Sequence, residues 1–305
     1  MTGLLETVAG LIIEAGVAIE DIYETDFRVD TKDDASPITE ADRRAHRIIR
    51  DGLAGIDIAG YSGLPFLSEE GIHTSFEERK TWKRYWLVDP LDGTKEFVQR
   101  NGEFTVNIAL IEDSLPAAGW VYVPVTGVLY IGFPGEGAYR LENARGKYRS
   151  SERASDTASP SDSASGPAAV MRSAVRLPDK NNAGSGTLKI VASRSHLNDT
   201  TKRYIDTIQQ RLGVPAETIQ AGSSLKLCRI AEGSADLYPR FGPTMEWDTA
   251  AAHAVCRAAG CRVISLETNN EMEYNKADLH NPHFIAAPAS RAERYIPSDS
   301  SPTQR

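Results

Sequence analysis

Cysteine is scarce in this 305-residue chain, which contains only Cys228, Cys256 and Cys261. Three thiols cannot form a disulfide framework, and their spacing includes no Cys-x-x-Cys pair of the kind that binds structural zinc. We therefore expect reduced thiols and a cytoplasmic protein, because thiols in the cytoplasm are kept reduced.

Positive charge and long apolar runs are also lacking. The chain has 34 Lys and Arg against 42 Asp and Glu, a net charge of −8, which argues against binding to a nucleic-acid polymer. No apolar run approaches the roughly 20 residues that span a bilayer. The first residues carry Glu6 and Glu14 within an apolar pattern, which predicts a helix rather than a signal peptide. We expect a globular protein with neither nucleic acid nor membrane as an integral partner.

A low-complexity segment divides the chain. Residues 149–186 are rich in Ser, Ala, Gly, Asp and Asn and poor in large apolar residues, so little there offsets the entropy of ordering. We predict a flexible insertion with at most a short strand near 168–175. The division leaves an N-terminal α+β domain at 1–148, an α/β domain at 187–287 and a flexible tail at 288–305.

Hydrophobic periodicity gives the expected elements. Apolar residues at helical spacing predict a helix over about 3–23 and a second one from near Thr39, where Thr39 and Asp42 have the spacing of a helix cap. Apolar runs separated by turns between residues 85 and 143 predict an antiparallel meander. After residue 187, strands and helices alternate, which is typical of an α/β arrangement.

Carboxylates gather in three stretches, Glu69-Glu70, Asp89 with Asp92, and Glu246-Trp-Asp248. Solvated surface charge is the usual explanation for Asp and Glu, but it fits Asp89 badly because the apolar run YWLV leads directly into it. Clustered carboxylates need a counter-charge, and an all-oxygen ligand set indicates Mg²⁺ or Mn²⁺. The local pattern alone favours a metal site only slightly over a purely structural role.

Longer motifs carry a resemblance to a known family. DPLDGT at 89–94, followed by WDTAAAHAV at 247–255, resembles the paired signature of the inositol monophosphatase family of Mg²⁺-dependent, lithium-sensitive phosphatases. The segments LSEE, VASRSH, GSSLK, YPRFGPTMEWD and NPHF extend the resemblance, in order, over most of Leu4–Ala286 apart from the insertion. It implies a layered αβαβα sandwich of the α+β class, two or three Mg²⁺ ions with Mn²⁺ as a substitute, and a cytoplasmic location, peripheral to the inner membrane in some relatives.

The resemblance also implies roles for individual residues. Thr94 and Asp42 would take a proton from an attacking water held by Glu69, and the backbone amides of Gly93 and Thr94 would face the phosphate. The implied metal ligands are Glu69, Asp89, the backbone carbonyl of Leu91, Asp92 and Asp248. The implied substrate site includes Glu69, Leu91, Asp92, Gly93, Thr94 and Asp248, with a nucleotide pocket of Ser193, His196, Ser223, Ser224, Lys226 and Arg240.

The implied reaction is hydrolysis of a small-molecule nucleotide bisphosphate. The 3′-phosphate of 3′-phosphoadenosine 5′-phosphate, or of its sulfated analogue, would be released by a water activated between two ions, which clears a by-product of sulfate assimilation. Two alternatives stay open. An inositol monophosphatase shares every metal ligand and differs at Lys226 and Arg240, whereas a non-catalytic nucleotide sensor need not keep the Thr94–Asp42 pair.

Overall fold

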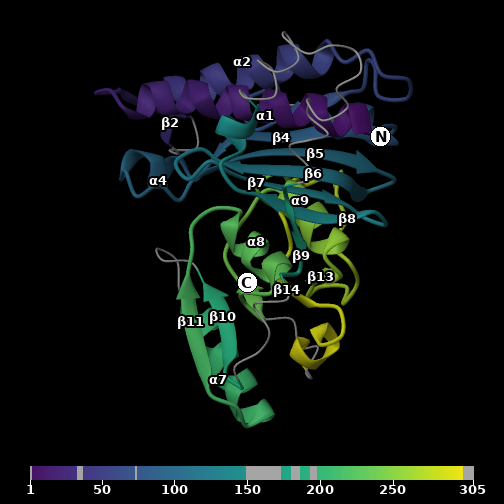
Figure 1. The fold of residues 1–305 in the computed structure, drawn as a ribbon. Coiled ribbons are helices and arrows are strands. Elements are labelled where there is room, and N and C mark those ends of the chain that lie inside the picture. The colour runs from purple at the N-terminus through teal and green to yellow at the C-terminus, as the bar shows by residue number, and fades with distance from the viewer. Residues whose placement is uncertain are drawn as a thin grey trace.

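The structure is a computed structural model that describes residues 2–32, 37–72, 74–148, 173–179, 186–192 and 198–297. Figure 1 shows these residues stacked in layers: helices from the start of the chain, a large sheet, helices from the second half of the chain, smaller strands, and a further helix at the far end. This layering confirms the expected αβαβα sandwich.

The large sheet has seven strands in the described part of the chain. Their order follows the sequence; β3 and β4 pair in parallel, and the other neighbours pair antiparallel, which confirms the meander. The strands are β3 (Phe66–Ser68), β4 (Arg84–Asp92), β5 (Thr105–Glu112), β6 (Leu115–Val123), β7 (Val128–Phe133), β8 (Gly137–Leu141) and β9 (Val175–Leu177).

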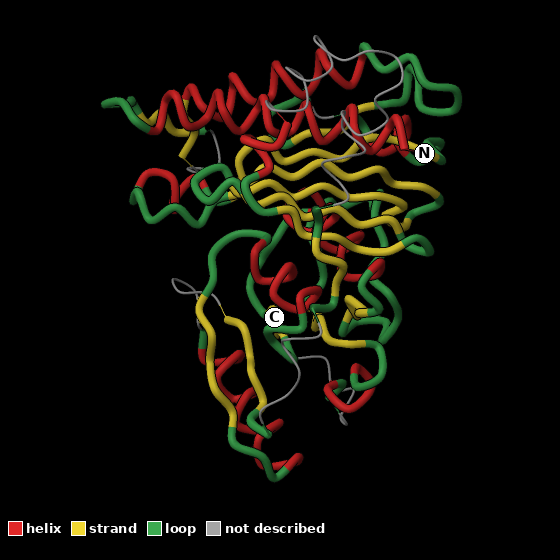
Figure 2. The backbone as a smooth tube through the Cα atoms, in the orientation of Figure 1, coloured by secondary structure: helices red, strands yellow, loops and turns green. Residues whose placement is uncertain are grey.

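Helices α1 (Thr2–Tyr23) and α2 (Glu40–Ala54) cover one face of this sheet, as Figure 2 shows. The apolar stripe of α1, which includes the fully buried Leu4, Ile12 and Ile19, packs in one core with Trp86 of β4 and Trp120 of β6. A hairpin of β1 (Val29–Thr31) and β2 (Pro37–Thr39) precedes α2, and the short helices α3 (Phe76–Arg79) and α4 (Thr94–Val98) flank β4.

The second half of the chain supplies the remaining layers. Strands β10 (Leu188–Ala192) and β11 (Ala216–Gln220) pair in parallel, while β12 (Tyr238–Arg240), β14 (Phe284–Pro288) and β13 (Cys261–Ser265) form an antiparallel group. An isolated bridge between Ile190 and Leu237 joins the two groups. The helices are α7 (Asp199–Leu212), α8 (Leu225–Glu232), α9 (Glu246–Ala258) and the 3-10 helix η2 (Ala292–Tyr295).

Helix α9 closes the other face of the large sheet at very short range. A Cβ atom added at Gly119 of β6 would lie 2.1 Å from the carbonyl oxygen of Ala251, and one at Gly132 of β7 would lie 2.4 Å from Cα of Val255. The two glycines therefore let the α9 backbone lie directly on the sheet. Because α9 comes from the second half of the chain, the two expected domains share one core.

Three expectations need correction or a boundary change. The flexible tail is wrong for 288–297, because Ala292 and Tyr295 are buried and the Tyr204 hydroxyl donates to the Tyr295 carbonyl. Strands β11 and β14 were not anticipated; β11 is mostly exposed and polar, so it lacks a strand pattern. The strand in the insertion is β9, at the edge of the large sheet, whereas 149–172 and 180–185 lie outside the described residues.

The structure also bears on the cysteines and on membrane-spanning helices. Cys228, Cys256 and Cys261 are buried and carry no disulfide. Within the described ranges, no helix combines the length and apolar character needed to cross a bilayer.

Candidate metal and substrate site

A β-bulge at the end of β4 brings two aspartates to one face of the sheet. Asp89 pairs with Asn107 and Asp92 pairs with Thr105, so three steps on β4 match two on β5. Side chains three apart on a regular strand point to opposite faces, and one extra residue restores the same face. The Leu91 amide caps the bulge by donating a 3.0 Å bond to Oδ1 of Asp89. The DPLD motif therefore projects both carboxylates toward α8 and α9.

Asp248 and Glu69 approach the same point from other elements. Asp248 is the third residue of α9, and its Oδ2 accepts a 2.9 Å bond from the Met245 amide at the helix start. One oxygen each of Asp89, Asp92 and Asp248 lie within 4.8 Å of one another. Glu69 follows β3, the parallel neighbour of β4, and its charge acts on Asp89. Three separate elements thus supply one carboxylate cluster.

The electrostatics of this cluster favour a bound cation. Burial, followed by the charges of Glu69, Asp92 and Asp248, raises the pKa of Asp89 well above its usual range. Burial and the charge of Asp92 do the same to the pKa of Asp248. Buried carboxylates so close together stay ionised only with a counter-charge. The converging donors are all oxygen atoms, which fits a hard divalent cation.

Asp42 and Thr94 meet beside this cluster. The Asp42 carboxylate is 2% exposed, and its Oδ2 accepts 2.7 Å bonds from the amide and the hydroxyl of Thr39, which confirms the expected cap of α2. Its Oδ1 accepts a 3.2 Å bond from the Thr94 hydroxyl. Burial raises the pKa of Asp42, and the two Thr39 bonds oppose that rise. Capping thus fixes one carboxylate oxygen and directs the other to Thr94.

The Ser223–Ser224 turn before α8 joins the two halves of the site. Ser223 donates its hydroxyl to Oδ2 of Asp92, which also accepts a 2.7 Å bond from the Ser224 amide. The Ser224 hydroxyl donates to the Asp248 carbonyl and accepts a 3.0 Å bond from Asn107. Both hydroxyls, expected to face a nucleotide, are bonded to the carboxylate site in this structure.

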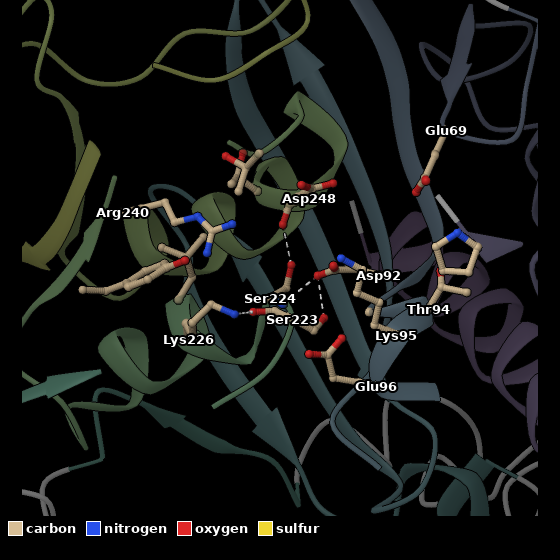
Figure 3. Close-up of a pocket in the computed structure, with 16 residues that line it drawn as sticks. Glu69, Asp92, Thr94, Lys95, Glu96, Ser223, Ser224, Lys226, Arg240 and Asp248 are labelled. Atoms are coloured by element: carbon tan, nitrogen blue, oxygen red, sulfur yellow. Dashed lines mark hydrogen bonds between the residues drawn. The ribbon is translucent and has the colours of Figure 1, made fainter. Parts of the chain in front are cut away.

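Lys226 and Arg240 lie across the cleft from Glu69 and Thr94, as Figure 3 shows. Lys226 is 7% exposed and its Nζ lies 5.9 Å from the centre of the Tyr238 ring. Nε of Arg240 is buried without a hydrogen-bond partner among the described residues, while its Nη2 donates to the Pro243 carbonyl. The cleft of about 270 Å³ is lined by Pro37, Glu69, Asp92, Gly93, Thr94, Lys95, Glu96, Ser223, Ser224, Lys226, Leu227, Tyr238, Arg240, Thr244, Asp248 and Thr249.

Comparison with known proteins agrees with this geometry. The model of the inositol monophosphatase family matches residues 2–301. The chain belongs to the inositol monophosphatase family. It is 42% identical over 284 residues to proteins named 3′(2′),5′-bisphosphate nucleotidase CysQ from Salmonella typhimurium and Escherichia coli K12, a match that covers 92% of this chain and 98% of each relative.

Solved structures of the family have the same fold. A crystal structure of CysQ from Bacteroides thetaiotaomicron superposes with a TM-score of 0.75 at 40% identity and covers 93% of this chain and 97% of that one. An IMPase from Thermotoga maritima superposes with a TM-score of 0.69 at 19% identity, covering 96% and 95%, which shows the fold alone.

Some site residues of this family member were not anticipated. Thr105 and Asn107 are buried and hydrogen-bonded to the Ser223–Ser224 turn. The sequence pattern that could have indicated them is a pair of polar residues, two positions apart, within an otherwise apolar strand. Lys32 forms ion pairs with Glu69, at 2.8 Å and 37 positions away in the sequence, and with the adjacent Glu70. No local sequence pattern indicates these contacts.

Two implied pocket residues, Ser193 and His196, lie outside the described residues. The Leu91 side chain is buried, and its carbonyl lies 3.4 Å from the Thr94 hydroxyl.

Proposed function

We propose that this protein is a Mg²⁺-dependent 3′(2′),5′-bisphosphate nucleotidase. It would remove the 3′-phosphate from 3′-phosphoadenosine 5′-phosphate and release AMP and phosphate, which clears a by-product of sulfate assimilation in the cytoplasm. The observation that carries the proposal is that one cleft is lined both by Asp92 and Asp248 of the carboxylate cluster and by the cations Lys226 and Arg240. The names of the 42% identical relatives support the same substrate class.

The cationic side of the cleft favours a substrate with two phosphates. Lys226 is nearly buried and Arg240 has a buried Nε without a partner. Buried cations are stabilised by a matched anion, which the non-reacting phosphate of a bisphosphate provides. Inositol 1-phosphate carries a single phosphate, which the carboxylate side of the cleft would take, and it would leave these cations unmatched. The arrangement therefore supports the nucleotidase over an inositol monophosphatase.

The oxygen donors of Glu69, Asp89, Asp92 and Asp248, with the Leu91 carbonyl, would hold Mg²⁺ ions, for which Mn²⁺ can substitute. The bound ions supply the Lewis acidity that hydrolysis of a phosphate ester requires. By family resemblance, Li⁺ would compete at this site and inhibit.

The protein's own groups would position the phosphate and move the proton. Gly93 has φ +92°, a conformation that favours glycine and that turns the chain from β4 into α4, where the amides of Gly93 and Thr94 would face the phosphate. The Thr94 hydroxyl donates its proton to a hydrogen bond with Asp42. The lone pairs of the Thr94 oxygen are therefore free to accept a hydrogen bond from the attacking water. Proton transfer then runs from water to Thr94 and from Thr94 to Asp42, whose raised pKa makes it a stronger base.

The decisive experiment compares phosphate release from 3′-phosphoadenosine 5′-phosphate and from inositol 1-phosphate, with Mg²⁺ at equal concentration. We expect strong preference for the nucleotide. Preference for inositol 1-phosphate would keep the carboxylate site and overturn the assignment of Lys226 and Arg240. No release from either substrate by folded, Mg²⁺-binding protein would indicate the non-catalytic sensor instead.

A further inference from the structure

Ser223 contacts both sides of the cleft. Its hydroxyl donates to Oδ2 of Asp92, and its carbonyl accepts a 2.7 Å bond from Nζ of Lys226. Figure 3 shows Ser223 between these two side chains, with a dashed line to each. A single residue therefore bonds to a carboxylate of the metal site through its side chain and to a cation of the opposite side through its backbone.

The backbone of Ser223 has a conformation that serine rarely adopts. Its φ is +49°, in the left-handed region, and such conformations persist only where the surrounding contacts fix them. Here the contacts are the Lys226 bond to the carbonyl and a 2.7 Å bond between the hydroxyls of Ser223 and Thr105. Since the Ser224 amide also donates to Asp92, the orientation of that carboxylate depends on the geometry of this turn.

Lys226 places a positive charge close to the carboxylates. It is 7% exposed and lines the same cleft as Asp92 and Asp248. In such a weakly solvated place its charge opposes the binding of a further cation at the aspartates, because like charges repel more strongly where water is scarce. An anion bound to Lys226 would neutralise that repulsion.

We propose that anion binding at Lys226 and Mg²⁺ binding at Asp92 and Asp248 strengthen each other, with Ser223 as the positioning residue that links them. The proposal rests on the proposed function for the identity of the two ligands. Coupling between two binding sites is reciprocal, so each ligand raises the affinity for the other by the same factor. A substrate with a second phosphate thus promotes assembly of the metal site on which its own hydrolysis depends.

The test is a calorimetric Mg²⁺ titration of the full chain with AMP, with adenosine, or without nucleotide. AMP carries the non-reacting phosphate, and adenosine is the same ligand without it. We expect AMP to lower the Kd for Mg²⁺ by about fivefold or more, and adenosine to leave it unchanged. Lys226→Met should lose the AMP effect. Some Mg²⁺ binds to AMP in solution, and this contribution is the same for wild type and for Lys226→Met. The difference between the two titrations therefore reports only the effect at the protein.

Two serine variants test the link. Ser223→Gly keeps the left-handed backbone without strain but removes the hydroxyl, so it should stay folded, weaken Mg²⁺ binding about tenfold and reduce the AMP effect. Ser265→Ala removes the hydroxyl of another buried serine, in β13, and should change neither quantity. Thermal unfolding without Mg²⁺ checks that each variant is folded.

The outcomes separate the coupling from the proposed function. An unchanged Kd for Mg²⁺ in the presence of AMP, or an equal AMP effect in Lys226→Met, overturns the coupling. If the same preparation hydrolyses 3′-phosphoadenosine 5′-phosphate, the proposed function stands without it. An AMP effect that needs Lys226, with no hydrolysis of that substrate, supports the coupling and overturns the proposed function.

Discussion

The amide of Ser224 donates a 2.7 Å hydrogen bond to Oδ2 of Asp92, across 132 positions of sequence. Ser224 lies at the start of α8, on the side of the cleft that carries Lys226 and Arg240. Asp92 belongs to the DPLDGT motif. The carboxylate site is thus assembled from both halves of the chain, and predictions about its residues depend on contacts between them.

Asp92→Asn should lower Mg²⁺-dependent turnover by at least about 100-fold. Replacing a residue that only hydrogen-bonds to a metal ligand lowers activity about 10- to 100-fold, and we expect the loss of a ligand itself to have a larger effect. The fold should survive, since asparagine can still accept the Ser224 bond and removes one repulsive charge. Phosphate release and melting temperature in chelator are the measurements. Asp51→Asn, on the exposed side of α2, is the matched control. Turnover near the wild-type rate would exclude Asp92 from the site.

Arg240→Ala should raise KM for 3′-phosphoadenosine 5′-phosphate about 10- to 100-fold, the value of a charge-assisted hydrogen bond. KM for adenosine 3′-phosphate, which lacks the second phosphate, should change little. Steady-state kinetics on both substrates give the comparison, and Arg203→Ala on the exposed face of α7 serves as control. Equal effects on the two substrates would mean that Arg240 does not read the second phosphate.

Thr94→Ala should lower kcat by about 10²- to 10⁴-fold, the usual contribution of general acid–base catalysis. Mg²⁺ affinity should change far less than kcat, because the Thr94 hydroxyl donates at 3.2 Å to Asp42, which is not a metal ligand, and its contact with the Leu91 carbonyl is longer, at 3.4 Å. Thr94→Ser retains the hydroxyl and should recover most of the rate. The hypothesis fails if alanine and serine variants have the same kcat.

The pH dependence should report on Lys226. Burial lowers its pKa to about 8, with Asp92 opposing the shift. Above pH 8 the free enzyme loses this charge, so kcat/KM should fall for the bisphosphate and not for adenosine 3′-phosphate. Lys226→Arg stays charged and should abolish this decline.

The same shift has a consequence for stability. The unfolded chain keeps the proton up to the ordinary pKa of 10.5, whereas the folded protein releases it near 8. Between these values the unfolded state binds more protons, so this group makes the protein more stable as pH rises and contributes no pH dependence below pH 8. Denaturant unfolding of wild type and Lys226→Met across pH 7–11 measures the difference.

Gly119→Ala should reduce the free energy of unfolding by about 1–3 kcal/mol, the cost of overpacking a core. It should also weaken Mg²⁺ binding, because the new methyl group would displace α9 and carry Asp248 away from Asp89. Gly10→Ala is the matched control, since a Cβ at that helical position meets nothing within 4 Å. Denaturant unfolding and calorimetry give both quantities; unchanged stability would mean that α9 can shift without cost.

Much of the fold and part of the carboxylate site could be predicted from the sequence. The helical stripe of α1, the cap formed by Thr39 and Asp42, and the meander all follow from local periodicity and spacing. The apolar run that leads into Asp89 indicated a buried carboxylate that needs a counter-charge. The family resemblance then connected Asp89 with Asp248. These inferences succeed because burial and backbone conformation impose short repeats on nearby residues.

Other features were decided only by the tertiary structure. Three contacts join segments that lie far apart in the chain: Lys32 with Glu69, Ser223 with Asp92, and Gly119 with Ala251. The sequence by itself determined which residue types could bind a cation and where the chain would turn. Folding decided which of them meet, because contacts between distant segments depend on how whole layers pack and leave no repeat in the local sequence.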